Sequence, residues 1–368
     1  MNIVVTGANG FIGKNLLVFL HEAGFDSITT ITRENSNDEI LSKVATADFI
    51  YHLAGINRPK SDDEFKVGNT DLTALIVNHL ISLDKKTPIV LSSSIQAEFD
   101  NPYGISKAAA EDLLNLYEDK TGANVYIYRL PNVFGKWCRP NYNSAVATFC
   151  HNTLNNLPIF IHNAEAELNL VYIDDVCKQF IRLLDSSIVD NGRFDITPTY
   201  KVTVGEVATL LGKFKESRNS LITEKVGSEF IRALYSTYLS YLEPSQFAYP
   251  VTQHSDERGT FVEMLKTKDS GQFSFFTAHI GVTRGGHYHH SKTEKFLVIK
   301  GKALFKFKHI VTDEFYELVV DGEESSIVET APGWSHDVTN IGNEELVVML
   351  WANEIFDRNN PDTINYKI

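Results

Sequence analysis

The stretch that decides the fold is TGANGFIG, residues 6–13, which follows the apolar run 3–5 and leads into the amphipathic stretch 14–23. Glycines at positions 7, 10 and 13 permit a tight turn, a close approach of the backbone to a pyrophosphate, and close packing of a helix on a strand. The free N–H groups at the start of that helix would face the phosphates. A strand, this turn and a helix in this order predict a dinucleotide-binding unit, with a purely structural turn as the alternative.

The rest of the sequence extends this unit into a larger α/β domain. Apolar runs at 3–5, 49–51, 89–91 and 125–128 alternate with amphipathic stretches such as 14–23 and 106–120. Short buried strands separated by helices are typical of a parallel sheet with helices on both faces. We therefore predict a Rossmann-type, doubly wound parallel sheet.

The pattern of apolar and turn-forming residues changes near residue 244. Short alternating segments separated by Gly, Pro and Asn, as in 294–308 and 345–351, predict an antiparallel β-sandwich or barrel. We assign residues 1–243 to the first domain, including a helical segment over about 201–243, and residues 244–368 to the second. Tyr235, Tyr238 and Tyr241 recur at every third residue of that segment, which favours packing of one domain on the other; stacking on a ligand is the alternative.

Length and composition agree with two globular domains and exclude some partners. The chain has 368 residues, 43% of them hydrophobic and 22% charged, and a formal net charge of −13. That charge argues against a general affinity for nucleic acid or for acidic membrane surfaces. The three cysteines have the spacing of neither a metal site nor a disulfide framework, and we find no targeting or membrane-spanning stretch. We therefore expect a cytoplasmic protein.

The end of the second strand indicates which nicotinamide cofactor is bound. Proteins that bind NAD usually place an acidic residue there, whereas this sequence has Thr32 and Arg33. An arginine can pair with the 2′-phosphate of NADP, and we expect no carboxylate at that position to repel it. The sequence therefore favours NADPH; a solvated loop arginine is the alternative.

A tyrosine and a lysine in NPYGISKAAAED, residues 101–112, are candidates for catalysis. Tyr103 and Lys107 are four residues apart, so they lie on one face of a helix. An ammonium group beside a phenol favours the phenolate, so we expect Lys107 to lower the pKa of Tyr103. Upstream, Ser94 is the last residue of a serine run at the carboxyl end of a predicted strand, where parallel sheets place their active sites. Its hydroxyl is the best candidate for binding a substrate oxygen beside Tyr103.

Taken together, the motifs of the first domain resemble those of a known family. TGANGFIG, HLAG (52–55), Asn69, LSSSIQA, YGISK and RLPNVFG (129–135) occur in the order typical of extended short-chain dehydrogenase/reductases that act on nucleotide sugars. The resemblance implies a catalytic set of Ser94, Tyr103 and Lys107, with Lys107 also at the nicotinamide ribose. It places Asn132 near the sugar nucleotide and gives Asn69 a role in a proton relay or in the cofactor site. The implied cofactor residues are Gly7, Asn9, Gly10, Phe11, Ile12, Gly13, Arg33, Leu53, Ala54, Gly55, Asn69, Ser92, Tyr103 and Lys107.

The second domain contains a candidate metal site. His287 and His289 project from the same face of a strand, Glu294 can reach them from the next strand, and His336 comes from a distant one. Three imidazoles and a carboxylate suit zinc or another divalent transition metal. His290 is a rival ligand to His289, and a structural pair of histidines is the alternative.

Residues 245–368 resemble the cupin superfamily through these histidines and the glycines around them. Pro332 directly precedes Gly333, which departs from the second cupin motif. DERGTFVEML, residues 256–265, resembles the first segment of cupin-type epimerases acting on nucleotide-linked 4-keto-6-deoxy sugars. That resemblance implies that Arg258 contacts the diphosphate; a solvated arginine is the alternative.

The pairing of the two domains resembles a family of capsular polysaccharide synthesis enzymes. It implies that the cupin domain epimerises C3 of UDP-2-acetamido-2,6-dideoxy-β-L-arabino-hexos-4-ulose. The first domain would then reduce C4 with NADPH to give UDP-2-acetamido-2,6-dideoxy-L-talose, and the enzyme would be a homodimer. A ketone at C4 acidifies the hydrogen on C3, so epimerisation must precede reduction.

The sequence leaves several questions open. His290, Lys292 and Asp337 are all candidates for the base of the epimerase, and the metal either polarises the ketone or only stabilises the barrel. A reductase with a merely structural cupin domain, and an NADP-sensing regulator without turnover, are the rival interpretations.

Overall fold

The structure is a computed structural model, and it describes residues 1–185, 191–256, 259–262, 264–267, 271–354 and 359–368. These residues form two compact units, one of Met1–Ser144 with Leu168–Lys201 and one of Ala145–Glu167 with Val202–Ile368. The prediction places residues 201–243 with the first domain, whereas by compactness nearly all of them group with the β-rich residues that follow.

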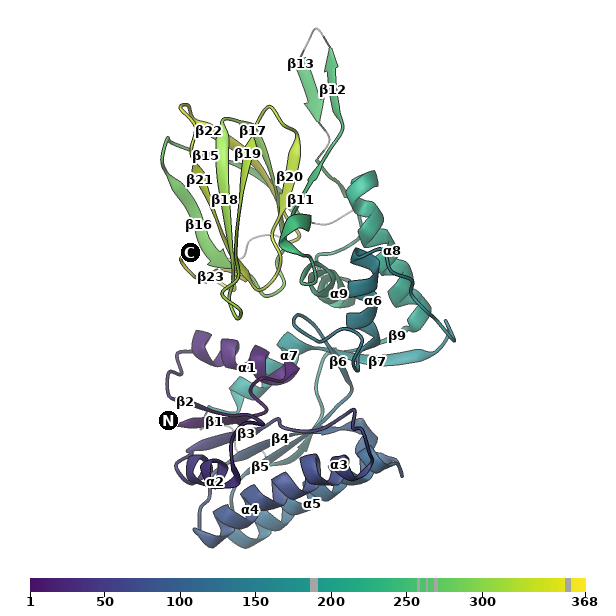
Figure 1. Ribbon diagram of the computed structural model, residues 1–368, viewed down its shortest axis with the longest axis vertical. Helices are drawn as coiled ribbons and strands as arrows, with labels where there is room; N and C mark the ends of the chain where they lie inside the picture. Colours follow the sequence, from purple (N-terminus) through teal and green to yellow (C-terminus); the bar gives the residue numbers. More distant parts are fainter. Residues whose placement is uncertain (186–190, 257–258, 263, 268–270, 355–358) are drawn as a thin grey trace. The chain divides into compact units, whose positions relative to one another are not determined.

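The first unit is built on a six-stranded sheet whose strands pair in parallel (Figure 1). In spatial order the strands are β2 (Ile28–Ile31), β1 (Ile3–Thr6), β3 (Phe49–His52), β4 (Ile89–Ser94), β5 (Val125–Leu130) and β8 (Gly192–Phe194). The four apolar runs predicted as strands are β1, β3, β4 and β5, which are buried almost throughout. The predicted Rossmann-type sheet is therefore confirmed.

Helices cover both faces of this sheet (Figure 1). One face carries α1 (Phe11–Glu22) and α7 (Ile173–Arg182), and the other carries α2 (Asn37–Ala45), α4 (Leu72–Ser82) and α5 (Pro102–Thr121). On the second face, side chains such as Ile76, Leu80 and Leu114 pack against Val4 and Ile50 of the sheet. The remaining elements are short: α3 (Asp63–Phe65), a π-helical turn η1 (Lys66–Asp71), a 3₁₀ turn η2 (Ile95–Glu98), and a three-stranded sheet of β6 (Asn132–Phe134), β7 (Glu167–Tyr172) and β9 (Thr199–Thr203).

The second unit begins with helices. They are α6 (Ala145–Leu154), α8 (Val204–Ser220) and α9 (Glu229–Leu239), followed by the 3₁₀ turn η3 (Pro244–Gln246). A capping box between Thr203 and Glu206 starts α8. Tyr235 and Tyr238 of α9 are buried, with ring centroids 4.9 and 5.8 Å from that of Phe214 on α8. These two tyrosines therefore pack inside the second unit.

Most of the rest of the second unit consists of two antiparallel five-stranded sheets, which form a cupin-like sandwich. One sheet has the order β11 (Ala248–Pro250), β20 (Ser326–Glu329), β17 (Glu294–Lys300), β22 (Leu346–Ala352) and β15 (Gln272–Ala278). The other has the order β19 (Phe315–Asp321), β18 (Lys302–His309), β21 (Trp334–Asn340), β16 (Thr283–Tyr288) and β23 (Ile364–Asn365). Two small pairs, β12 (Gln253–Asp256) with β13 (Gly259–Val262) and β10 (Ile222–Thr223) with β14 (Lys266–Thr267), complete the unit.

Strand β17 departs from the alternating pattern that the sequence predicts for residues 294–308. Its first five residues are all buried, whereas β18 alternates between buried and partly exposed residues. The reason is a buried polar cluster on the outward side of β17. There Lys295 binds Glu329 of β20 at 2.5 Å, and Arg218 of α8 also donates to Glu329. Helix α8 thus covers a face that would otherwise meet water.

None of the helices in the described ranges has both the length and the apolar character needed to cross a membrane.

Candidate active site and metal centre

The glycine turn joins β1 to α1 in the conformation that the sequence predicts. Gly7 has a positive φ of 68°, which favours glycine. A Cβ atom on Gly7 would lie 2.7 Å from the nitrogen of Ala54, and one on Gly13 would lie 2.3 Å from the carbonyl oxygen of Gly7. Side chains do not fit at either position, so the turn packs closely against the segment after β3 and against the first turn of α1.

A cavity of about 810 Å³ opens beside this turn, within the range of small-molecule sites. Residues from the turn, the end of β2, the segment after β3 and the start of α4 line it. They include seven predicted cofactor residues: Gly7, Asn9, Gly10, Arg33, Leu53, Ala54 and Gly55. Phe11, Ile12 and Gly13 form the first turn of α1 instead. The lining residues Asn35, Asn37, Val67, Gly68, Asp71, Leu72 and Leu75 belong to no motif, so sequence reasoning missed them.

The surroundings of Arg33 differ in one respect from the expectation. Arg33 is exposed and lines the cavity, as an arginine binding the 2′-phosphate would. Glu34, however, lines the same cavity. The expectation that no carboxylate is present there is wrong, because the chain turns after β2 and brings the residue next to Arg33 to the cavity as well.

The three predicted catalytic residues come together at the carboxyl end of β4. Helix α5 begins at Pro102 beside this end, because the side chain of Asn101 caps it by accepting a hydrogen bond from the N–H of Gly104 at 2.9 Å. The hydroxyl of Ser94 lies near enough to the phenol of Tyr103 to lower its pKa. One turn further along, the Nζ atom of Lys107 lies 6.0 Å from the centroid of the Tyr103 ring.

Lys107 also links this cluster to the cavity. Its Nζ atom donates to the carbonyl oxygen of Ser92 at 3.0 Å, which places Ser92 in the site through its backbone. A Cβ atom on Gly55, which lines the cavity, would lie 3.1 Å from the same Nζ atom. Gly55 therefore lies between the cavity and the side chain of Lys107.

Burial determines the protonation states of Tyr103 and Lys107. It raises the pKa of Tyr103, and the hydrogen bond from Ser94 only partly opposes that rise. It lowers the pKa of Lys107 to about 8, against the attraction of Glu111. The expectation that Lys107 lowers the pKa of Tyr103 is thus corrected: burial raises that pKa, and Ser94, not Lys107, opposes the rise. Near neutral pH the phenol keeps its proton, as an acid must before it donates one.

Asn69 lies in the π-helical turn η1 and holds two segments together. Its Oδ1 atom accepts from the N–H of Ile56 at 2.7 Å, and its Nδ2 atom donates to the carbonyl of Ile56 at 3.0 Å and to Ser106 Oγ at 2.9 Å. Asn69 thereby fixes the segment after β3 against α5. Its predicted part in a proton relay stays a prediction.

Of the two predicted substrate residues, Asn132 is within the part of the chain that the structure describes. Asn132 is the exposed first residue of β6, where it pairs with Leu170 of β7. Arg258 lies outside the described residues.

The second unit brings the four predicted metal ligands together. One ligand atom from each of His287, His289, Glu294 and His336 lies within 4.8 Å of all the others. The Nε2 atoms of His289 and His336 are each 3.2 Å from Glu294 Oε2. His287 and His336 are paired across β16 and β21, which explains how residues distant in sequence meet.

The state of these side chains fits a divalent metal ion. Within the described residues, Nε2 of His289 and both ring nitrogens of His336 are buried without a hydrogen-bond partner. Burial and the neighbouring imidazoles lower the pKa of His287 to about 3, and burial lowers that of His336. Burial alone would raise the pKa of Glu294, yet the adjacent imidazoles hold it well below its usual range. Neutral imidazoles and an ionised carboxylate are the forms that bind a metal.

Two further residues, Lys292 and Asp362, lie next to this centre. Lys292, one of the three candidate bases, has its Nζ atom 3.0 Å from Glu294 Oε1. The Nδ1 atom of His289 lies 2.5 Å from the carbonyl oxygen of Asp362. Asp362 is 73 residues away in the sequence, so no local pattern could indicate it.

Fold and site together define a nicotinamide-dependent oxidoreductase joined to a cupin-like sandwich. Comparison with known proteins supports this and specifies it. The model of the NAD dependent epimerase/dehydratase family matches residues 3–197, which is more than half of the chain, and the polysaccharide biosynthesis C-terminal domain matches residues 254–364. The chain belongs to the NAD dependent epimerase/dehydratase family.

Two relatives match along the whole length. The UDP-2-acetamido-2,6-beta-L-arabino-hexul-4-ose reductase of Pseudomonas aeruginosa is 57% identical over 363 residues, 99% of this chain and 98% of that protein. The crystal structure of the capsular polysaccharide assembling protein CapF from Staphylococcus aureus has 44% identity and a TM-score of 0.69, covering 100% of both chains. The chain is therefore CapF-like throughout, and both predicted domain types are confirmed.

A more distant structure shares only the fold of the first part. UDP-glucose 4-epimerase from Thermotoga maritima is 22% identical, with a TM-score of 0.52, and covers 58% of this chain and 82% of that one.

Proposed function

We propose that the chain converts UDP-2-acetamido-2,6-dideoxy-β-L-arabino-hexos-4-ulose into UDP-2-acetamido-2,6-dideoxy-L-talose, a capsular polysaccharide precursor, in two steps. The second unit epimerises C3, and the first unit then reduces the C4 ketone with NADPH. The observation that carries the proposal is the cluster of Ser94, Tyr103 and Lys107 at the edge of the glycine-turn cavity. The Pseudomonas aeruginosa relative, named as a reductase of this 4-keto sugar, supports the choice of substrate.

In the reduction, the residues of the first unit bind the ketone and protonate it. Reduced nicotinamide supplies a hydride when NADPH is bound. Ser94 hydrogen-bonds the ketone oxygen, and Tyr103 transfers its hydroxyl proton to that oxygen as the alcohol forms. The ammonium group of Lys107 then stabilises the phenolate that remains, because the two groups lie one helical turn apart.

Arg33 supports the choice of NADPH over NADH. It lies where it can bind the 2′-phosphate of the cofactor in a charge-assisted contact. Glu34 on the same cavity limits this preference through repulsion. We therefore expect NADPH to be preferred while NADH is still accepted weakly.

The metal centre supports the epimerisation. His287, His289, Glu294 and His336 would hold the ion, and three nitrogen donors with one oxygen donor suit zinc. A divalent ion supplies Lewis-acid polarisation of a carbonyl oxygen when bound. The C4 ketone itself acidifies the neighbouring C3–H, so a side-chain base can remove that proton and a proton can return to the opposite face of C3.

The direct test is oxidation of NADPH, followed by its absorbance, with a panel of UDP-linked 4-keto sugars. We expect the N-acetylated 4-keto-6-deoxy sugar to be the best substrate and the product to be inverted at C3. Turnover with unchanged C3 configuration would favour the rival interpretation, a reductase with a structural cupin domain. No turnover with any member of the panel would overturn the proposal.

Two further expectations belong to the proposal. We expect a homodimer, which light scattering can test. We also expect the enzyme to work in the cytoplasm, where its three cysteines would stay reduced.

A further inference from the structure

The segment between β16 and β17 controls two of the four proposed metal ligands. His289 stands at its beginning, and Glu294 follows at its end as the first residue of β17. The residues in between, 290–293, are all buried. The conformation of this short segment, which we call the ligand loop (residues 289–294), therefore sets the distance between the two ligands.

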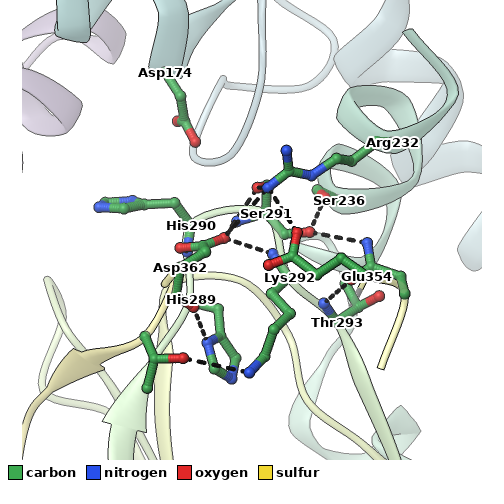
Figure 2. Close-up of polar contacts among 12 residues, drawn as sticks. Asp174, Arg232, Ser236, His289, His290, Ser291, Lys292, Thr293, Glu354 and Asp362 are labelled. Atoms are coloured by element: carbon green, nitrogen blue, oxygen red, sulfur yellow. Dashed lines mark hydrogen bonds and ion pairs between the residues drawn. The ribbon is translucent and has the colours of Figure 1, made fainter. Parts of the chain in front are cut away.

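The carboxylate of Asp362 binds the backbone of the ligand loop (Figure 2). Its Oδ1 atom accepts from the N–H of His290 at 2.8 Å, and its Oδ2 atom accepts from the N–H groups of Ser291 and Lys292, both at 2.7 Å. The hydroxyl of Ser291 adds a contact at 3.0 Å. Three successive N–H groups around one anion form a concave nest, and the two oxygens of Asp362 accept from all three.

The backbone of the same residue binds a ligand directly. The carbonyl oxygen of Asp362 is 2.5 Å from Nδ1 of His289. A carbonyl can only accept, so Nδ1 must carry the proton. Nε2 is then left with a free lone pair, and this is the atom that lies beside Glu294 and His336. Asp362 thus fixes both the backbone of the ligand loop and the tautomer of His289.

Other parts of the second unit hold this arrangement in place. Arg232 of α9 donates to Ser291 Oγ and pairs with Glu354 at 3.0 Å, and Ser236 Oγ donates to the carbonyl of Ser291 at 2.6 Å (Figure 2). Directly after Asp362, β23 pairs with β16, with Ile364 opposite Tyr288 and Asn365 opposite His287. The C-terminal segment therefore runs along the strand that carries His287.

We propose that Asp362 is a positioning residue for the metal centre, through which the C-terminal segment determines how tightly the second unit binds its metal. The inference rests on the proposed metal centre. Second-sphere partners of metal-binding histidines typically contribute 10–100-fold to affinity. Asp362 combines such a partner with the anion that shapes the ligand loop.

The test compares three variants of the full chain. Asp362→Asn keeps the size of the side chain but replaces one acceptor oxygen with an NH₂ group, which would face backbone N–H donors. Ser291→Ala removes one contact to Asp362 and leaves the three N–H groups. Lys367→Ala, an exposed residue of the same C-terminal segment, is the matched control. For each variant, Zn²⁺ affinity is measured by competition with a chelator, and the absorption spectrum is recorded at full loading with Co²⁺.

We expect Asp362→Asn to weaken Zn²⁺ binding about 10–100-fold and to change the Co²⁺ spectrum, because the ligand loop that carries His289 and Glu294 loses the anion that its N–H groups bind. Ser291→Ala should act in the same direction more weakly, and Lys367→Ala should match the wild type. Wild-type affinity and spectrum in Asp362→Asn would overturn the inference, even if that variant melts at a lower temperature. If Asp362→Asn does not fold, the same two measurements on Ser291→Ala decide. A wild-type chain that binds no Zn²⁺ would refute the metal centre itself and this inference with it, whereas an unaffected Asp362→Asn leaves the proposed function standing.

Discussion

At the scale of single residues, the reductase site depends on how deeply Tyr103 and Lys107 are buried. Burial raises the pKa of the phenol and lowers that of the amine to about 8. The phenol therefore holds its proton at neutral pH, while the amine remains mostly charged. This is the state in which Tyr103 can donate a proton and Lys107 can stabilise the anion that forms.

The first prediction concerns Tyr103→Phe, which removes the proposed acid. We expect the rate of NADPH oxidation to fall by about 10²–10⁴-fold, the usual contribution of a general acid. NADPH binding, measured by fluorescence titration, should be unchanged, because the cavity is lined by other residues. Tyr117→Phe on the same helix is the control: its hydroxyl binds the carbonyls of Lys85 and Thr87, away from the site, so its loss should leave the rate unaltered. Full activity in Tyr103→Phe would instead favour the NADP-sensing regulator.

The second prediction is a pH dependence set by Lys107. Its pKa is lowered to about 8, so it is charged below that pH and neutral above it. We expect kcat/KM to be level near pH 7 and to fall about tenfold per unit above pH 8. In Lys107→Arg the charge persists at all these pH values, so the decline should disappear whatever the absolute rate. A level profile from pH 7 to 9 in the wild type would contradict this role.

Residue spacing predicted the catalytic and metal-binding side chains but not their environment. The interval between Tyr103 and Lys107 is a local property of a helix, visible in any sequence. The direction of the Tyr103 pKa shift was missed because it depends on desolvation by packed neighbours, such as Phe65, whose ring centroid lies 5.5 Å away. Glu34 was missed because its position depends on the path of the chain after β2.

At the scale of elements, a buried polar cluster joins α8 to the sandwich. Glu329 of β20 pairs with Arg218 of α8 and with Lys295 of β17, and the Nζ atom of Lys295 also donates to Tyr249 Oη at 2.7 Å. The attraction of Lys295 and Arg218 overcomes burial and lowers the pKa of Glu329. The cluster remains intact only while both cations are present, because a buried carboxylate needs full compensation.

The third prediction follows for Arg218→Met, which leaves Glu329 with one cationic partner. We expect the second unit to lose about 3 kcal/mol of stability, the lower end of the cost of breaking a buried pair. Differential scanning calorimetry should show a lower transition temperature for that unit. Lys213→Met on the same helix removes an exposed pair with Glu224 and should cost less than about 1 kcal/mol. Equal losses of stability in the two variants would show that the buried cluster contributes no more than an exposed ion pair.

Helices and strands were predictable from the sequence where the pattern of apolar residues is local. They were less predictable where another element of the fold buries one face of a strand. The four parallel strands of the first unit were predicted from short apolar runs. Strand β17 was expected to alternate, and it does not, because Lys295 on its outward side is buried in a cluster with Glu329 of β20 and Arg218 of α8. A lysine in a strand gives no sign in the sequence that it will be buried.

At the scale of the whole molecule, the proposed chemistry fixes the order of the two steps. The hydrogen on C3 is acidic only while C4 is a ketone, so reduction ends the possibility of epimerisation. A reductase that acted first would release a sugar that the second unit could not change. The order follows from the substrate alone and needs no particular arrangement of the two units.

The fourth prediction separates the steps with His336→Ala and solvent deuterium. Without NADPH, the wild type should exchange the C3 hydrogen of the 4-keto sugar in D₂O. His336→Ala should contain less metal and lose this exchange, yet still reduce a 4-keto sugar that has already been epimerised. His279→Ala, at an exposed position outside the ligand set, is the control and should exchange normally. Absence of exchange in the wild type would remove the epimerase and leave the reductase.

The order of the two domain types was predictable, but the compact unit to which residues 202–243 belong was not. Motifs mark a domain by local spacing, and both family models agree with the predicted types. The helical segment carries no motif, and it joins the sandwich through contacts such as Ser236 with Ser291, 55 residues apart. Pairings of that kind arise only in the folded chain.

The π-helical turn Lys66–Asp71 also limits which chain lengths this fold accepts. Such a turn holds one residue more than an α-helical turn, and each helical residue rotates the chain by about 100°. Deleting one residue before Asn69 would relieve the irregularity, but it would rotate the amide away from Ile56 and Ser106. A regular α-helix over residues 66–71 is therefore incompatible with the hydrogen bonds between Asn69 and Ile56. We expect natural variation in this stretch to proceed by substitution and not by deletion.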